Sequence, residues 1–424
     1  MGTKQGGAAL LILLTVLVLG AATLLVSRLN QLSSRFDDSR KTDQALVAAK
    51  EALLGWALSA EQRPGLLPVP DLATDGNYDG DSDCPFGSLN SSHQLGRLPW
   101  RRYLNAPPAA YCSGNRGGVG GLLKDAAAEP LWYAVSANLL YDGGYPVINS
   151  DIAGLSSGWL TVRDRQGNVL SNRVAAVLLS AGEMLAGQNR SGAAATADNY
   201  LDSVTVMGTT YSNADADLDF IAASESDTFN DRLVYITIDE LLAQVERKVV
   251  ATARACLEAY AAVSGNKYPW AAPLNATAPP SYIGQLNSHF GRIPATPNIE
   301  ASAGVNDAAM QSSWQPANCF SGLSYWPDWR ESIFFRVAPG YAPGSGASCP
   351  TCLTFGGLGN YHAVVVLAGA ALAGQTRTSS ADKGSIGNYL EGDNADGDND
   401  FERQAASAVF NDRALCLDGG GGCR

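Results

Sequence analysis

The apolar residues of this sequence gather first in one uninterrupted run near the N-terminus. Residues 8–26 contain no charged side chain, and Thr15 and Thr23 are their only polar ones. Such a run, about 19 residues, rises about 28 Å as a helix, close to the thickness of the hydrocarbon core of a bilayer. Lys4 precedes the run and Arg28 follows it. The pattern predicts a transmembrane helix over residues 8–30.

Three kinds of segment share this pattern. A cleaved secretory signal has a shorter apolar core that ends in small residues, but here the run continues past Gly20 to Val26. A plain single-pass anchor is the second kind. The third is a helix that continues into a folded head, and apolar residues do recur at helical spacing beyond the run. They are Leu29, Leu32, Phe36, Leu46, Ala49, Leu53, Trp56 and Ala57. The sequence therefore predicts one helix of roughly 50 residues.

Beyond this helix the sequence repeats itself. Six short blocks return in the same order, which indicates two copies of one domain. The blocks are SHQLGRLP (92–99) and SHFGRIP (288–294), LWYAV (131–135) and IFFRV (333–337), LAGQNR (185–190) and LAGQTR (372–377), NYLD (199–202) and NYLE (388–391), NADADLDF (213–220) and NADGDNDF (394–401), and FNDR (229–232 and 410–413). We expect a first repeat over residues 31–238 and a second over residues 239–424.

Each repeat reads as a helix followed by short strands. The helix of the second repeat is expected from about Asp239 to Val263. Apolar runs of strand length are 159–162, 169–170, 174–179 and 233–238 in the first repeat, and 333–337, 363–367 and 414–417 in the second. The predicted fold class is α+β, with a long N-terminal transmembrane helix followed by two tandem domains, each a helix packed on an antiparallel sheet.

The residues ahead of the apolar run form a short leader. Residues 1–7, MGTKQGG, hold one basic residue and end in glycine at the apolar border. With the long helix behind it, this segment resembles the start of a type IV prepilin or pseudopilin. The resemblance implies that a prepilin peptidase cuts after Gly7 (or Gly6) and that the new first residue, Ala8 after a cut at Gly7, is methylated. It also implies pilin-like heads, a single-pass protein of the bacterial inner membrane with its head in the periplasm, and other pilins or pseudopilins as partners of the helix.

One departure from that family changes what the resemblance implies. Most major pilins carry Glu at the fifth mature position, where this sequence has Ile12 (or Leu11 after a cut at Gly6). In the family, loss of this Glu marks the large minor pseudopilin at the tip of type II protein secretion systems. The resemblance thus implies a minor subunit that assembles, primes or caps a type IV pilus (a fimbrium) or a secretion pseudopilus. The alternative is a calcium-dependent adhesin or binding module on a membrane anchor.

Composition excludes other classes of function. Charged residues make up 17% of the chain, and the net charge is −12 with no basic stretch, so nucleic acid is not an expected partner. The chain has only 3 histidines, and it contains no nucleophile elbow, phosphate loop or HExxH motif. We expect no enzymatic activity.

The cysteines predict disulfides. There are 8 of them: Cys84, Cys112, Cys256, Cys319, Cys349, Cys352, Cys416 and Cys423. Cys349 and Cys352 form a CxxC motif, for which redox chemistry or half of a zinc site are alternatives to a structural bridge. We expect structural disulfides, whose pairing cannot be deduced from the sequence.

Acidic loops make calcium the expected cofactor. Asp75, Asn77, Asp79 and Asp81 alternate as in the first half of an EF-hand loop, although Phe86 stands where the bidentate Glu is expected. A similar alternation in the second repeat consists of Asn394, Asp396, Asp398 and Asp400, and its counterpart in the first consists of Asn213, Asp215, Asp217 and Asp219. Solvated turns rich in Asn, Asp and Gly are the alternative.

Overall fold

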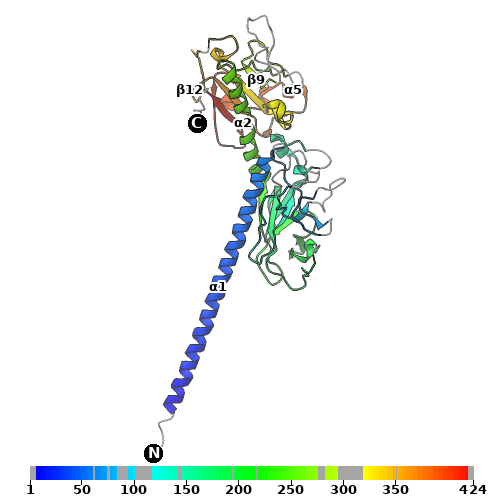
Figure 1. Ribbon diagram of the computed structural model, residues 1–424, viewed down its shortest axis with the longest axis vertical. Helices are drawn as coiled ribbons and strands as arrows, with labels where there is room; N and C mark the ends of the chain where they lie inside the picture. Colours follow the sequence, from blue (N-terminus) through cyan, green and yellow to red (C-terminus); the bar gives the residue numbers. More distant parts are fainter. Residues whose placement is uncertain are drawn as a thin grey trace, which may run out of the picture.

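The computed structural model describes residues 6–60, 63–73, 77–83, 94–101, 117–141, 146–192, 195–215, 217–275, 282–294, 319–346, 348–349 and 351–418. A single long helix leads from the N-terminus to two regions of sheet, one beside the end of the helix and the other beyond it (Figure 1). The leader residues 1–5 lie outside the described residues.

Helix α1 spans Gly6–Ser59 without interruption. Its last turns bury Leu46, Ala49, Leu53 and Ala57, each at most 1% exposed, on the face that their spacing predicts. These side chains belong to the main hydrophobic core. The rest of the helix extends away from the sheets (Figure 1).

The predicted transmembrane helix is wrong. Over the part of the chain that the structure describes, no helix is both long and apolar enough to cross a membrane. Helix α1 also runs on past residue 30 without a break, into a segment where Arg40 pairs with Asp37 and Lys41 with Asp38. The fold has several sheets and few helices. The predicted fold class, which begins with a long N-terminal transmembrane helix, is therefore wrong. The predicted location as a single-pass protein of the inner membrane with a periplasmic head is corrected with it.

The first repeat contains a six-stranded sheet. Its strands are β1 (Leu95–Arg97), β2 (Trp132–Val135), β3 (Leu160–Asp164), β4 (Val169–Ser180), β7 (Asp219–Ala222) and β8 (Arg232–Thr237). The order is β1-β2-β4-β3-β7, and β8 pairs with the second part of β4. All pairs are antiparallel except β3–β7. A separate hairpin consists of β5 (Ser203–Val206) and β6 (Thr209–Ser212).

The second repeat builds the same core sheet. Its strands are β9 (Phe290–Arg292), β10 (Ile333–Val337), β13 (Ala363–Leu367) and β15 (Arg413–Leu417), in the antiparallel order β15-β13-β10-β9. This order matches β8-β4-β2-β1 of the first repeat. A smaller sheet, β12-β11-β14, consists of β11 (Leu353–Phe355), β12 (Leu358–Tyr361) and β14 (Asp400–Phe401), and its parallel pair β11–β14 corresponds to β3–β7.

Short helical turns connect these elements. They are η3 (Ala137–Leu139), η4 (Ser150–Gly154), η5 (Ala197–Asn199), η7 (Phe320–Gly322), α4 (Trp326–Trp329), η8 (Arg330–Ser332), η9 (Pro339–Tyr341), α5 (Ser380–Lys383), η10 (Ile386–Asn388) and η11 (Gly392–Asn394).

Helix α2 (Ile238–Val263) joins the two repeats into one core. The Thr237 hydroxyl caps its start by accepting from the Glu240 amide, 3.1 Å away. The helix packs on β4 and β8 of the first repeat and on β13 and β15 of the second, and it also contacts α1. The largest cluster of buried side chains lies around it and contains residues of both repeats, and each repeat has a further cluster of its own. Ser150 Oγ adds a hydrogen bond to the Ala368 carbonyl across the junction, at 3.0 Å.

The repeated Gly-Arg step marks a place where two backbones touch. A Cβ atom on Gly291 would lie 1.9 Å from the Ala272 carbonyl oxygen, and one on Gly96 would lie 2.4 Å from that of Asp71. Each of these contacts belongs to an antiparallel bridge beside the edge strand, at Arg292 and at Arg97. Only glycine permits so close an approach.

Replacing Gly291 by Ala should lower the free energy of unfolding by about 1–3 kcal/mol, because the backbone must move apart. Urea denaturation measures the change. Gly387→Ala is the matched control, since nothing lies within 4 Å of a Cβ there, and it should change stability by less than about 0.5 kcal/mol. If both variants lose the same unfolding free energy, the close backbone contact is not what makes alanine unfavourable in place of Gly291.

Candidate functional site

The repeated blocks that lie far apart in the sequence meet around a buried pair of carboxyl groups in the first repeat. Asp202 and Asp231 are 6% and 4% exposed. Asp231 Oδ2 accepts from the Asp202 amide at 2.8 Å, and Asp202 Oδ2 accepts from the Asn230 amide at 2.7 Å. Side-chain amides complete the set, Asn213 to Asp231 at 3.0 Å and Gln188 to Asp202 at 2.8 Å. Four of the six blocks thus supply one hydrogen-bonded network.

The second repeat builds the same network with Glu391 and Asp412. Asp412 Oδ2 accepts from the Glu391 amide at 2.9 Å, and Glu391 Oε2 accepts from the Asn411 amide at 3.0 Å. Asn394 donates to Asp412 at 3.2 Å, and Gln375 donates to Glu391 at 2.8 Å. The longer Glu side chain replaces Asp without changing which groups bond to one another. We refer to Asp202–Asp231 and Glu391–Asp412 as the two carboxyl pairs.

Burial makes one acid of each pair hard to ionise. It raises the pKa of Asp231 to about 8, and the nearby negative charge of Asp202 adds to the rise. Burial likewise raises the pKa of Asp412 to about 8, with the charge of Glu391 as the next cause. The pKa of Asp202 is also raised by burial. Each pair therefore favours a state in which it holds a proton at neutral pH.

The repeated arginines next to the carboxyl pairs form their ion pairs elsewhere. Arg190 lies 3.5 Å from Glu129, and Arg377 lies 2.7 Å from Asp151. Both also donate to backbone carbonyls, including Gly182 for Arg190 and Gly369 for Arg377, each within 2.9 Å. These arginines hold the surrounding loops in place.

A second repeated feature is an arginine enclosed by aromatic rings. The guanidinium carbon of Arg97 lies 4.3 Å from the ring centre of Trp132 and 4.1 Å from that of Tyr200. Arg292 lies 5.1 Å from the rings of both Phe334 and Tyr389.

Each cage is already filled by the protein's own cation, so the rings stabilise the fold through cation–π contact. Burial also lowers the pKa of Arg97.

The arginine that ends the repeated FNDR block holds the helix of its own repeat. Arg232 donates to Ser39 Oγ of α1 at 2.7 Å and forms an ion pair with Asp43 at 2.5 Å. Arg413 donates to Glu246 of α2 at 2.8 Å. Each carboxyl pair is therefore next in sequence to the contact between sheet and helix.

The structure places the predicted calcium residues in turns. Asp79 accepts from the Asp81 amide at 2.8 Å, and its other oxygen lies 3.2 Å from Arg101. Asn77 is exposed, and Asp75 lies outside the described residues.

In the second repeat, Asp396 accepts from the Asp398 amide at 3.0 Å, and Asp398 accepts from the Asp400 amide at 2.7 Å. Asn394 is turned inward to the carboxyl pair, and Asp400 accepts from the Thr354 hydroxyl at 2.6 Å. In the described residues, no three His, Cys, Asp or Glu side chains are grouped so that they could hold a metal ion. Calcium binding stays a prediction.

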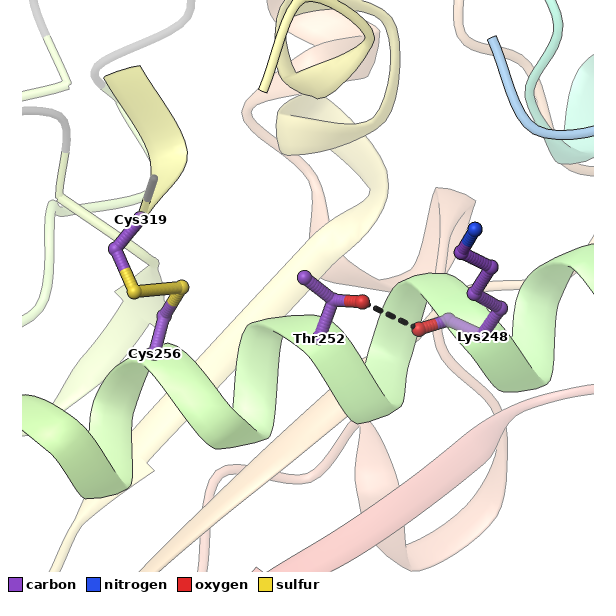
Figure 2. Close-up of a disulfide and its surroundings, with 4 residues drawn as sticks. All are labelled: Lys248, Thr252, Cys256 and Cys319. Atoms are coloured by element: carbon purple, nitrogen blue, oxygen red, sulfur yellow. Dashed lines mark hydrogen bonds between the residues drawn. A yellow bond between two sulfur atoms is a disulfide. The ribbon is translucent and has the colours of Figure 1, made fainter. Parts of the chain in front are cut away.

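Two disulfides join described cysteines. Cys256 on α2 is bonded to Cys319, 63 residues further along the chain (Figure 2). In the same view, one turn earlier on α2, Thr252 Oγ1 donates to the Lys248 carbonyl at 2.9 Å. Cys349 is bonded to Cys352, and Cys416 is disulfide-bonded as well. Cys84, Cys112 and Cys423 lie outside the described residues.

The predicted cleavage site lies in the first turn of α1, which contains Gly6, Gly7 and Ala8. The carboxyl pairs are not among the site residues predicted from the sequence, although they belong to the repeated blocks NYLD/NYLE and FNDR. The signal in the sequence is an acidic residue that both copies keep in each of these two blocks.

The comparisons with known proteins add no relative. No protein-family model, no curated protein and no solved structure matches this chain. The likeness to type IV prepilins therefore depends on the leader, residues 1–7, and on the long helix that follows it.

Proposed function

We propose that this protein is a minor subunit of a type IV pilus or of a type II secretion pseudopilus, and that it joins the filament through α1. The observation that carries the proposal is the exposed apolar surface of this helix away from the sheets. Leu14, Leu17, Val18 and Leu19 are between 61% and 67% exposed. Apolar side chains grouped in this way mark a surface that another protein covers.

The geometry of the two repeats supports α1 as the assembling element. The helix has 54 residues, so it is about 81 Å long. Among its described side chains, the buried apolar ones lie in the C-terminal part, from Leu46 on, whereas those near Leu17 are exposed and available for contact with other subunits. Helix α2 cannot take this role, because its apolar side chains are buried between the repeats.

The test places a charge on the exposed face of α1. Leu17→Glu should reduce the amount of this protein recovered with sheared pili or pseudopili by more than tenfold, since a buried unpaired carboxylate is costly in a helix bundle. Immunoblots of the filament fraction measure it. The melting temperature should not change, because Leu17 is 67% exposed.

Met207→Glu is the matched control, because Met207 is 94% exposed at the turn between β5 and β6, far from α1 in sequence. It should leave recovery unchanged. If Leu17→Glu enters filaments as well as the unaltered protein does, α1 is not the assembling element. Counting pili and measuring type II secretion in the same strains distinguishes a pilus subunit from a pseudopilus subunit. If the protein binds a ligand and its loss has no effect on filaments, the alternative of an adhesin or binding module is favoured.

A further inference from the structure

The two disulfides between described cysteines differ in what they connect. The Cys256–Cys319 bridge joins a helix to a segment 63 residues away. The Cys349–Cys352 bridge spans three residues, so it closes a turn and joins no element to another. A bridge of this kind contributes little as a cross-link.

The two bridges also differ in access. Cys256 is buried in the core around α2, with 4% of its surface exposed, whereas its partner Cys319 is partly exposed. Cys349 and Cys352 are both partly exposed, and their neighbours Ser348 and Thr351 are exposed. Both ends of the second bridge thus have exposed surface, although Cys349 also packs against a buried cluster, whereas the first bridge has a buried cysteine at one end. We therefore expect a thiolate in solution to reach the second bridge more readily while the chain stays folded.

The backbone on either side of the CxxC bridge is held by other contacts. The Ser348 carbonyl lies so close to Gly340 that a Cβ there would be 1.5 Å from its oxygen. Strand β11 begins directly after Cys352 with Leu353, which is fully buried and pairs with Tyr361. The Thr354 amide donates to the Asn399 carbonyl at 2.9 Å. Opening the bridge would leave these contacts in place.

We propose that the Cys349–Cys352 bridge is a thiol–disulfide exchange site whose reaction partner is a dithiol. One thiolate of the dithiol attacks a bridge sulfur, the bond between the two cysteine sulfurs breaks, and a mixed disulfide forms while the other cysteine leaves as a thiolate. The second thiol of the partner, as its thiolate, then attacks the mixed disulfide. Two electrons and two protons pass to the cysteines, which become thiols, and the partner becomes a disulfide.

The test follows each cysteine of the full chain in dithiothreitol redox buffers. Free thiols are alkylated after acid quenching and assigned by peptide mass spectrometry. Cys349 and Cys352 should become half reduced at a ratio of reduced to oxidised dithiothreitol at least about 100-fold lower than the ratio needed for Cys256 and Cys319. The far-ultraviolet circular dichroism should stay unchanged during this first step. Reduction of both bridges in one step, or only with loss of the folded signal, would overturn the proposal.

A variant traps the mixed disulfide. Cys352→Ser exposed to oxidised glutathione should form one glutathione adduct, on Cys349, while folded. The matched variant Cys319→Ser leaves the buried Cys256, which should stay unmodified at the same glutathione concentration as long as its circular dichroism is that of the unaltered chain. Equal labelling of Cys349 and Cys256 in folded protein, or no adduct on Cys349, would contradict the inference.

Discussion

Replacing Cys256 and Cys319 together by Ala should lower the free energy of unfolding by about 4 kcal/mol. The bridge closes a loop of 63 residues, and the loss of chain entropy in the unfolded state grows with the length of such a loop. It also joins α2, the helix at the centre of the shared core, to the segment that begins η7 (Figure 2). Urea denaturation with linear extrapolation measures the change.

The matched control is Cys349→Ala with Cys352→Ala. This bridge spans three residues, so its loss should cost no more than about 2 kcal/mol. Both variants should unfold in a single transition, because the largest cluster of buried residues contains side chains of both repeats. The interpretation fails if the short bridge proves to be the more stabilising one, or if the repeats unfold in separate steps.

Stability should fall as the pH rises from about 4 to about 8. The pKa of both Asp231 and Asp412 is raised to about 8 in the folded protein, against about 3.9 for Asp in an unfolded chain. Between these values the folded state binds more protons than the unfolded state. The stabilisation is complete below the unfolded pKa and is lost as the pH passes through the folded pKa.

Asp412→Asn keeps the shape of the neutral acid and removes its titration. It should make the fall in unfolding free energy less steep by about 1 kcal/mol per pH unit between pH 5 and pH 8. Asp231→Asn should act in the same way in the first repeat. Chemical denaturation at several pH values measures the slopes.

Asp382→Asn is the control, because the pKa of Asp382 is lowered where that of Asp412 is raised. Hydrogen bonds from the Ser379 backbone and side chain lower the pKa of Asp382 to about 2, so its contribution is present above the unfolded pKa and is lost only as the pH falls below about 4. Its substitution should leave the slope between pH 5 and pH 8 unchanged. If the unfolding free energy depends on pH equally in the unaltered protein and in Asp412→Asn, the pKa of Asp412 is not raised in the folded protein.

Local pattern was enough to predict several elements. Apolar runs at 333–337 and 363–367 became β10 and β13, because a strand buried on both faces has apolar residues at nearly every position. Arg336 is the exception in β10, and it is only partly buried. The run at 233–238 became β8 within one residue. The helix expected from about Asp239 to Val263 became α2, which ends at the same residue. Its length and apolar period are properties of the segment itself.

Pairings between distant segments could not be predicted in the same way. The parallel pairs β3–β7 and β11–β14 each join short strands separated by about 40 residues or more, and no local pattern encodes such a partner. The carboxyl pairs have the same origin, because Asp202 and Asp231 lie 29 residues apart. Acidic residues are usually exposed, and the sequence around each of these two gives no sign of burial.

The sequence by itself determined the duplication, the apolar face of the long helix near Leu46 and Leu53, and most strands of the two central sheets. Each of these depends on residues close together in the chain or on direct repetition. Only the tertiary structure decided that α2 serves both repeats and that the acids of two repeated blocks are buried against one another. The physical reason is that burial and pairing depend on which distant surfaces meet, and that information is distributed over the whole chain.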